Sequence, residues 1–316
     1  MANAAKAYVT NTDSDDISVV DVKSRKELKR VSVGGSPRGA VRFDREKNFG
    51  YVSNCAGNTV SVVDLNRDRE VAKITVGIAP RGMTLSPDGR HAYVSNSGDN
   101  TLSIVDLTER REIRRIAMGA NPRHMAVIPK ANRLLVAQWG SDAIGNLDLT
   151  TGLTSLSALS AIPVGSGARP YSLTPNSDGT VAYVANTQAD YISVVDISNS
   201  SEKKRIQVGY GSRAIAFSSD EKFAFVSIEN ANEIVVIDTV KNAVATRVSV
   251  GPSPRGVALS VASHELFSSN FSRGNSGFGD AARNSLTVVD VKDPRKAKVV
   301  AHIKVGLGPC SVSILE

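Results

Sequence analysis

The sequence predicts an all-β protein, a seven-bladed β-propeller with four antiparallel strands per blade. Three short markers recur in a fixed order along the 316 residues, and each occurs seven times. Between the markers lie short runs of Val, Ile, Leu and Tyr at a spacing of two, separated by Gly, Pro, Asn and Asp. Such alternation, repeated at intervals of about 42 residues, is typical of propeller blades.

The three markers fix the number of blades. The first is a strand end with the pattern aromatic-Val-x-Asn, complete at 8–11, 51–54, 93–96 and 183–186 and degraded in the other three repeats. The second is an alternating strand that ends in an aspartate, at Asp21, Asp64, Asp106, Asp148, Asp196, Asp238 and Asp290. The third is a glycine that closes the last strand of each repeat, at Gly34, Gly77, Gly119, Gly165, Gly209, Gly251 and Gly306.

The two ends of the chain are out of phase with the blades. The sequence begins on a second strand at 6–11 and ends on a first strand at 310–315. We therefore expect the C-terminal strand to join the N-terminal blade and to close the ring without a covalent bond. Residues 1–316 are expected to form one domain, because repeat folds grow as a single body.

Composition limits the classes of partner. The net charge of +7 is carried largely by predicted outer strands, where Lys and Arg discourage pairing between sheet edges, so a nucleic-acid partner is not favoured. No apolar run is long enough to span a membrane. With 5% aromatic residues there is no sign of a large sticky interface, and a monomer is the default expectation. The N-terminal residues lack the apolar core of a secretory signal, which leaves the compartment open.

Metal and cofactor sites are not expected. The two cysteines, Cys55 and Cys310, exclude a disulfide framework and a multi-cysteine metal cluster. No histidine or cysteine pair has the spacing of metal ligands.

The motifs Tyr-Val-Thr-Asn, Val-Gly-x-x-Pro-x-Gly and Ser-Pro-Asp-Gly resemble the YVTN family of β-propeller repeats. The resemblance covers essentially the whole chain and implies the propeller fold. It implies little about activity, because such propellers include enzyme subunits, binding proteins and surface proteins. Family members are often exported.

One position counted from the closing glycine is basic in almost every repeat. Four residues after the glycine the sequence has arginine six times and cysteine once, at Arg38, Arg81, Arg123, Arg169, Arg213, Arg255 and Cys310. The connections that carry these residues should open around the channel. Six guanidiniums there would form a strong positive focus able to bind carboxylate or phosphate. The alternative is a structural role, with each arginine paired to an aspartate or to loop carbonyls of its neighbour.

Positions at which one blade departs from the others indicate where a small asymmetric ligand could bind. Directly after the first marker, complete or degraded, stand Thr12, Cys55, Ser97, Trp139, Thr187, Glu229 and Phe271. Trp139, Phe271 and Cys55 would give a pocket apolar walls, against the alternative of ordinary loop variation. His124 follows a ring arginine where Gly39, Gly82 and Gly256 stand in other blades, which makes it the first candidate acid or base and Glu229 the second.

Blade seven carries a long insertion, residues 271–284, where other blades use about four residues. Its glycines would make it mobile, and Phe278 and Arg273 would give it groups that contact a ligand. We expect a lid or recognition loop, and the alternative is a surface loop without a function that the fold tolerates.

Three functional hypotheses remain open. The first is binding of a small anionic ligand, bearing a carboxylate or a phosphate, at the arginine-lined channel mouth. The second is a metal-independent lyase, isomerase or hydrolase in the same pocket, with His124 or Glu229 moving protons. The third is a protein-interaction scaffold.

Overall fold

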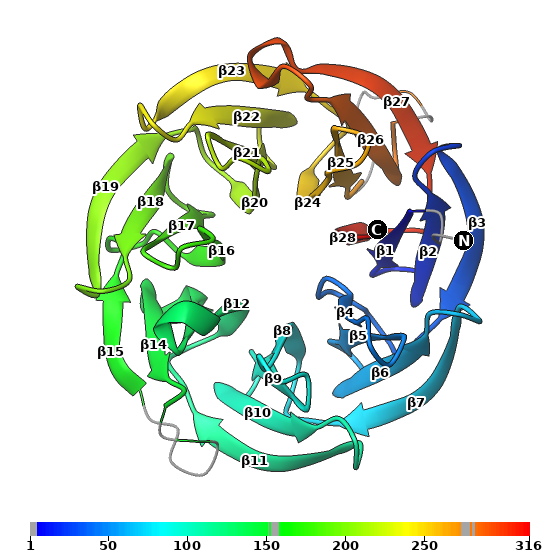
Figure 1. The fold of residues 1–316 in the computed structure, drawn as a ribbon, viewed down its shortest axis with the longest axis vertical. Helices are drawn as coiled ribbons and strands as arrows, with labels where there is room; N and C mark the ends of the chain where they lie inside the picture. The colour runs from blue at the N-terminus through cyan, green and yellow to red at the C-terminus, as the bar shows by residue number, and fades with distance from the viewer. Residues whose placement is uncertain (1–4, 151, 153–157, 273–278, 280–281) are drawn as a thin grey trace.

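The computed structural model is a ring of seven four-stranded antiparallel sheets around a central channel (Figure 1). It describes residues 5–150, 152, 158–272, 279 and 282–316. The predicted fold class is confirmed. The connections that the structure describes contain three short 3-10 helices: η1 (Pro129–Ala131), η2 (Trp139–Ser141) and η3 (Pro294–Lys296).

Each blade runs from an inner strand at the channel to an outer strand at the rim. The inner strands are β4 (Arg42–Asp44), β8 (Pro80–Leu85), β12 (Pro122–Ile128), β16 (Pro170–Pro175), β20 (Ser212–Phe217), β24 (Pro254–Ser260) and β28 (Pro309–Leu315). The second strands are β1 (Lys6–Asn11), β5 (Phe49–Asn54), β9 (His91–Asn96), β13 (Arg133–Gln138), β17 (Val181–Asn186), β21 (Phe223–Ile228) and β25 (Glu265–Asn270).

The third strands end in the aspartates of the second marker. They are β2 (Asp16–Asp21), β6 (Thr59–Asp64), β10 (Thr101–Asp106), β14 (Ala143–Asp148), β18 (Tyr191–Asp196), β22 (Glu233–Asp238) and β26 (Ser285–Asp290). The outer strands are β3 (Lys26–Ser32), β7 (Arg69–Thr75), β11 (Arg111–Ala117), β15 (Ala158–Pro163), β19 (Ser201–Gln207), β23 (Ala243–Ser249) and β27 (Lys298–Lys304).

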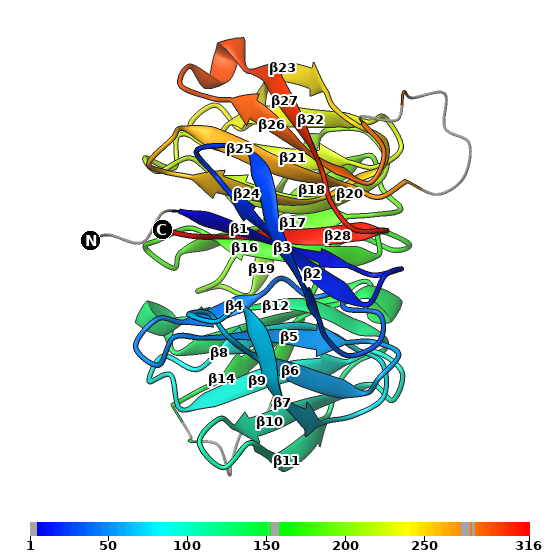
Figure 2. The same ribbon diagram turned by 90° about the vertical axis from the view of Figure 1, so that its right-hand side faces the viewer.

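The last strand closes the ring as the sequence predicts. β28 pairs with β1 in antiparallel register, with Lys6 opposite Leu315 and Asn11 opposite Pro309, so the first sheet has the order β28-β1-β2-β3. Lys6 and Leu315 therefore lie on one face of the ring, and the inner strands begin on the other face (Figure 2). We call the opening on this second face the channel mouth.

The first and third sequence markers meet in space, which explains why they recur together. A Cβ added to Gly77 would lie 2.4 Å from Nδ2 of Asn96, so only glycine leaves room for the asparagine there. Nδ2 of Asn96 donates to Oγ of Ser103, at 2.8 Å, and to Oγ1 of Thr101, at 2.9 Å. The same asparagine therefore joins a second strand to a third strand and packs on the closing glycine.

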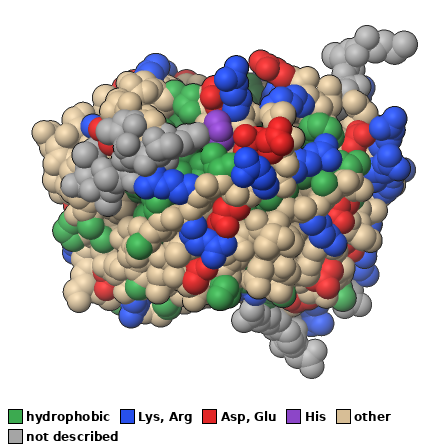
Figure 3. Space-filling model, turned by 90° about the horizontal axis from the view of Figure 1, so that it is seen from below, with side chains coloured by type: hydrophobic (Ala, Val, Ile, Leu, Met, Phe, Trp, Pro, Cys, Tyr) green, Lys and Arg blue, Asp and Glu red, His purple; other side chains and the backbone are tan. Residues whose placement is uncertain are grey.

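Apolar side chains from neighbouring blades form the core between them. One cluster joins Tyr8 and Val19 of the first blade to Val41, Val52 and Val63 of the second. On the rim, Figure 3 shows Lys and Arg side chains interspersed with Asp and Glu. In the part of the chain that the structure describes, no helix is long and apolar enough to cross a membrane.

Candidate functional site

The central channel is a cavity of about 800 Å³ lined by residues from all seven inner strands and the segments that lead into them. Each blade contributes one residue to the mouth. In each blade the last residue of the first marker pairs with a residue of the inner segment, and the residue after that partner is the one at the mouth, as Arg81 follows Pro80, the partner of Asn96. We call these seven the ring residues: Arg38, Arg81, Arg123, Tyr171, Arg213, Arg255 and Cys310. The structure thus brings five of the predicted arginines and the cysteine together at one opening.

Arg169 is not among the residues that line the channel, and Tyr171 takes the equivalent place in blade five. Pro170 pairs with Asn186 as Pro80 pairs with Asn96, so the ring position is 171. The segment between Gly165 and Pro170 has two more residues than its counterpart in blade three, which displaces a count made from the glycine. Placing Arg169 in the ring by that count was therefore wrong.

The side chain of Arg169 instead holds η2 to its neighbour. Its Nη1 donates to the carbonyl oxygens of Trp139, at 3.3 Å, and Gly140, at 3.2 Å, and its guanidinium lies 4.8 Å from the centre of the Trp139 ring. This is the structural role that the sequence left as an alternative for the whole arginine set.

Glu229 neutralises part of the ring by bridging two of its arginines. Oε1 of Glu229 accepts from Nη2 of Arg255 at 2.8 Å, and Oε2 accepts from Arg213. The side chain of Arg255 is 8% exposed and that of Glu229 15%, so the ion pairs are largely buried. Burial raises the pKa of Glu229, but the two guanidiniums outweigh it and hold the pKa below its ordinary value.

The other three ring arginines have no carboxylate partner among the described residues. Nε of Arg81 donates to Oγ of Ser97 at 2.9 Å, and Nε of Arg123 donates to Oδ1 of Asn121 at 2.8 Å. Nε of Arg38 is buried and has no hydrogen-bond partner in the described part of the chain. One side of the mouth therefore holds three guanidiniums that no acid compensates.

Mutual repulsion between these cations is visible at Arg123. Burial, followed by the positive charge of Arg81, lowers the pKa of Arg123 to about 10. Arg213 and Arg38 lower it further, and Tyr171 opposes them. Besides burial, three neighbouring guanidiniums thus contribute to the low pKa of Arg123, and a bound anion would relieve their repulsion.

The residues that follow the first marker support the ring from behind and do not line the channel. Trp139 lies 4.9 Å from the guanidinium of Arg123, and Phe271, fully buried, lies 3.8 Å from that of Arg255. These cation–π contacts fix the arginines without neutralising them. Cys55 is half-buried and is also absent from the channel lining.

Arg273 and Phe278, the two residues predicted to contact a ligand from the blade-seven insertion, lie outside the described residues. Their roles stay predictions.

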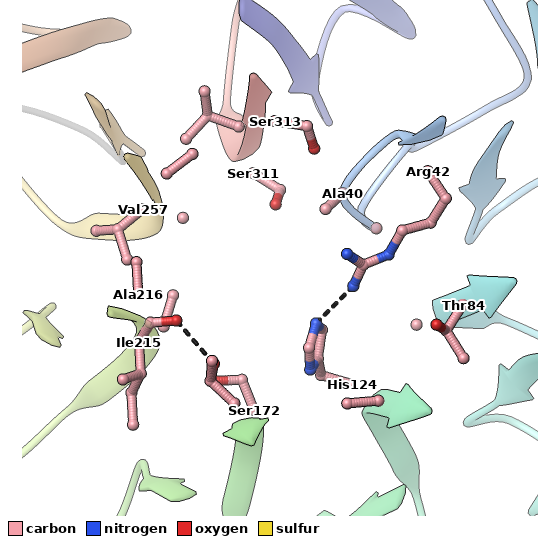
Figure 4. A pocket seen from close by; sticks show the side chains of 18 of the residues that line it. Ala40, Arg42, Thr84, His124, Ser172, Ile215, Ala216, Val257, Ser311 and Ser313 are labelled. Carbon is pink, nitrogen blue, oxygen red and sulfur yellow. Dashed lines mark hydrogen bonds between the residues drawn. The ribbon is translucent and has the colours of Figure 1, made fainter. Parts of the chain in front are cut away.

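His124 and Arg42 meet inside the channel, as Figure 4 shows, and Arg42 pairs with Tyr51, further along the blade than the ring residue Arg38. Nη2 of Arg42 lies 2.8 Å from Nε2 of His124, and Nε of Arg42 donates to the carbonyl oxygen of Met83 at 2.9 Å. Burial and then the charge of Arg42 lower the pKa of His124 to about 3, although a contact with the backbone of Leu173 opposes the shift. The histidine is therefore neutral near pH 7, and its Nε2 accepts the hydrogen bond from Arg42.

The sequence indicated neither Arg42 nor Tyr171. An alignment on the proline that opens most inner strands would have found Tyr171. Arg42 stands out only when strand pairing is known, because an extra residue precedes it in blade two.

Comparison with known proteins supports the fold. A model of the cytochrome d1 haem domain matches residues 5–97, a model of the seven-bladed β-propeller lactonases matches residues 78–169, and a model of the LVIVD repeat matches residues 178–204. Each covers less than half of the chain, so together they support a β-propeller repeat protein. Among curated proteins no relative matches this sequence.

Solved structures match over nearly the whole chain. The periplasmic gluconolactonase of Pseudomonas aeruginosa has a TM-score of 0.82 at 16% identity and covers 99% of both chains. A putative 6-phosphogluconolactonase from Bacteroides fragilis has a TM-score of 0.77 at 15% identity, with coverage of 100% of this chain and 99% of that one. A functionally unknown protein from Desulfotomaculum acetoxidans reaches 0.80 at 15% identity, with coverage of 98% and 99%. At such identities the likeness shows the fold alone.

The side chains in the described channel lining that could ligate a haem iron are His124, Met125, Tyr171 and Cys310. Among the described lining residues the one histidine is His124, and its Nε2 is already engaged by Arg42. No group of three His, Cys, Asp or Glu side chains lies together elsewhere in the described ranges.

Proposed function

We propose that the channel mouth binds a small molecule that carries a carboxylate or a phosphate. The observation that carries this proposal is the set of three ring arginines, Arg38, Arg81 and Arg123, without a carboxylate partner among the described residues. Guanidinium groups bind both kinds of anion in a bidentate way. The aromatic and polar groups behind them hold the arginines in place before a ligand arrives, which lowers the entropy cost of binding.

Sugar acids and their phosphorylated forms are the ligand class that the comparisons favour. The lactonase model matches residues 78–169, a segment that includes Arg81 and Arg123, and two of the similar structures are described as a gluconolactonase and a putative 6-phosphogluconolactonase. The Tyr-Val-x-Asn repeats support placing the chain among the YVTN-type propellers.

Acid–base chemistry in the same pocket has less support. A general acid must be protonated at the working pH, and His124, with a pKa of about 3, is neutral near pH 7. Both oxygens of Glu229 accept from arginines, which makes this carboxylate a weak base. Hydrolysis of a lactone therefore stands second to binding.

The binding proposal predicts a titration result. Isothermal titration should detect gluconate, 6-phosphogluconate and inorganic phosphate, with affinities that fall as salt is raised, and should detect no glucose. Arg81→Gln or Arg123→Gln should weaken gluconate binding by about tenfold or more, because each removes a charge-assisted hydrogen bond. Gluconolactone added in the same experiments would reveal hydrolysis through proton release.

The matched control is Arg67→Gln. Arg67 pairs with Asp64 on the opposite face and its side chain is 68% exposed, so this variant loses the same charge far from the mouth. Equal losses of affinity in Arg67→Gln and Arg81→Gln would contradict a specific site at the ring.

A further inference from the structure

Arg42 breaks the sevenfold pattern inside the channel. It pairs with Tyr51, and the residues at the same register in the other six inner strands are all small: Thr84, Ala126, Thr174, Ala216, Ala258 and Ser313. A long cation thus replaces a methyl or hydroxyl group at one point of the channel wall. The core between the blades does not require it, since the other blades pack without it.

The inner segment that carries Arg42 pairs less regularly with its neighbour than the corresponding segment of blade three does. Between Pro37 and Arg42 the pairing with β5 shifts by two residues, whereas the pairing of β8 with β9 shifts by one between Pro80 and Gly82. One extra residue therefore stands in blade two, and the regular part of β4 begins only at Arg42. Such an irregularity re-aims a side chain, and bulges of this kind occur preferentially beside functional sites.

Within the described ranges, the charge of Arg42 has no counter-ion in the channel. Its hydrogen-bond partners are the carbonyl oxygen of Met83 and the neutral ring of His124. No Asp or Glu is among the described residues that line the cavity. Hydroxyl groups of Thr84, Ser311 and Ser313 lie on the same stretch of wall (Figure 4). Arg42 is half-buried, and a cation partly withdrawn from water without an acid beside it is stabilised when an anion joins it.

We propose that Arg42, oriented by His124, forms a second anion subsite below the ring, and that the ligand is an elongated molecule with an anionic group at each end. This inference rests on the proposed function, because the ring would hold one end while Arg42 holds the other. Arg38 and Arg42 are four residues apart, so their backbones are at most about 14 Å from each other along the wall. That separation suits two anionic groups on one small carbon chain, such as the carboxylate and phosphate of a phosphorylated sugar acid.

The test compares 6-phosphogluconate with gluconate, which lacks the second anion. In the wild type, 6-phosphogluconate should bind about 10- to 100-fold more tightly. Arg42→Thr introduces the residue that blades three and five carry at this register, so the ring should still fold. This variant should bind gluconate as the wild type does and lose the advantage of 6-phosphogluconate. Arg42→Lys, which keeps the charge, should retain part of that advantage.

Thr174→Ala is the matched control, because it changes the same register in blade five, away from Arg42, to the residue that blade four carries, and it should leave both affinities unchanged. If Arg42→Thr keeps the full advantage while Arg81→Gln abolishes it, both anions bind at the ring and the second subsite is refuted. If Arg42→Thr weakens both ligands equally, Arg42 belongs to a single site and the inference also fails. Absence of binding by either ligand to the wild type would overturn the proposed function itself.

Discussion

A chain that ends at Gly308 loses cooperative unfolding. The deletion removes β28, which pairs along the whole of β1 and contributes Val312 to the core between the first and seventh blades. Without it the inner edge of β1, with its unpaired backbone groups, faces the channel, and the ring is open on one side. Net stabilities of folded domains are about 5–15 kcal/mol. Loss of an entire inner strand removes contacts worth a comparable free energy. Thermal and urea unfolding followed by circular dichroism would reveal the loss.

A circular permutant provides the control for this deletion. Lys6 lies opposite Leu315, so residues 309–316 can precede residue 5 through a short hairpin turn and occupy the same place in the sheet. The permutant should unfold cooperatively near the wild-type midpoint. A truncated chain that melts as the wild type does would contradict closure by β28.

Glu229→Gln destabilises the protein by about 3 kcal/mol, because it leaves two buried guanidiniums without their shared acid. The amide keeps the shape of the side chain, so the loss reports on charge. An anion that binds the ring should replace the missing carboxylate. Phosphate or gluconate should therefore raise the melting temperature of the variant more than that of the wild type.

Glu233→Gln is the control for charge removal at a more exposed pair. Glu233 pairs with Arg247, whose side chain is 42% exposed, and such pairs contribute at most about 1 kcal/mol. Anions should give this variant no added stability beyond that of the wild type. A Glu229→Gln variant as stable as the wild type, or one that anions do not restore, would argue against excess positive charge at the mouth.

The fold could be predicted because the markers in the sequence are the contacts that build each blade. Asn96 of the first marker packs on Gly77 of the third marker and donates to Ser103, so one contact accounts for two of the three recurring signals. Ring closure could be predicted in the same way. The sequence begins on the second strand of a blade and ends on a first strand, so the last strand completes the first blade.

The site could be predicted only in part, because it depends on the register of strand pairing and on contacts between blades. Counting from a glycine fails where loop length changes, as at Arg169, and it misses Arg42, which an extra residue displaces from the repeat. The bridge from Glu229 to Arg255 joins blade six to blade seven, and no spacing in the sequence specifies it. The sequence marks His124 as a departure from the pattern, but its neutral state follows from burial and from Arg42, which spacing does not show.

The most direct test of the central claim is a crystal of the wild-type protein soaked in selenate, an anion that anomalous diffraction can locate. The account predicts an anomalous peak at the channel mouth within hydrogen-bond distance of the guanidiniums of Arg38, Arg81 and Arg123. Peaks confined to the lysines and arginines of the outer strands, with none at the mouth of the same crystals, would contradict it.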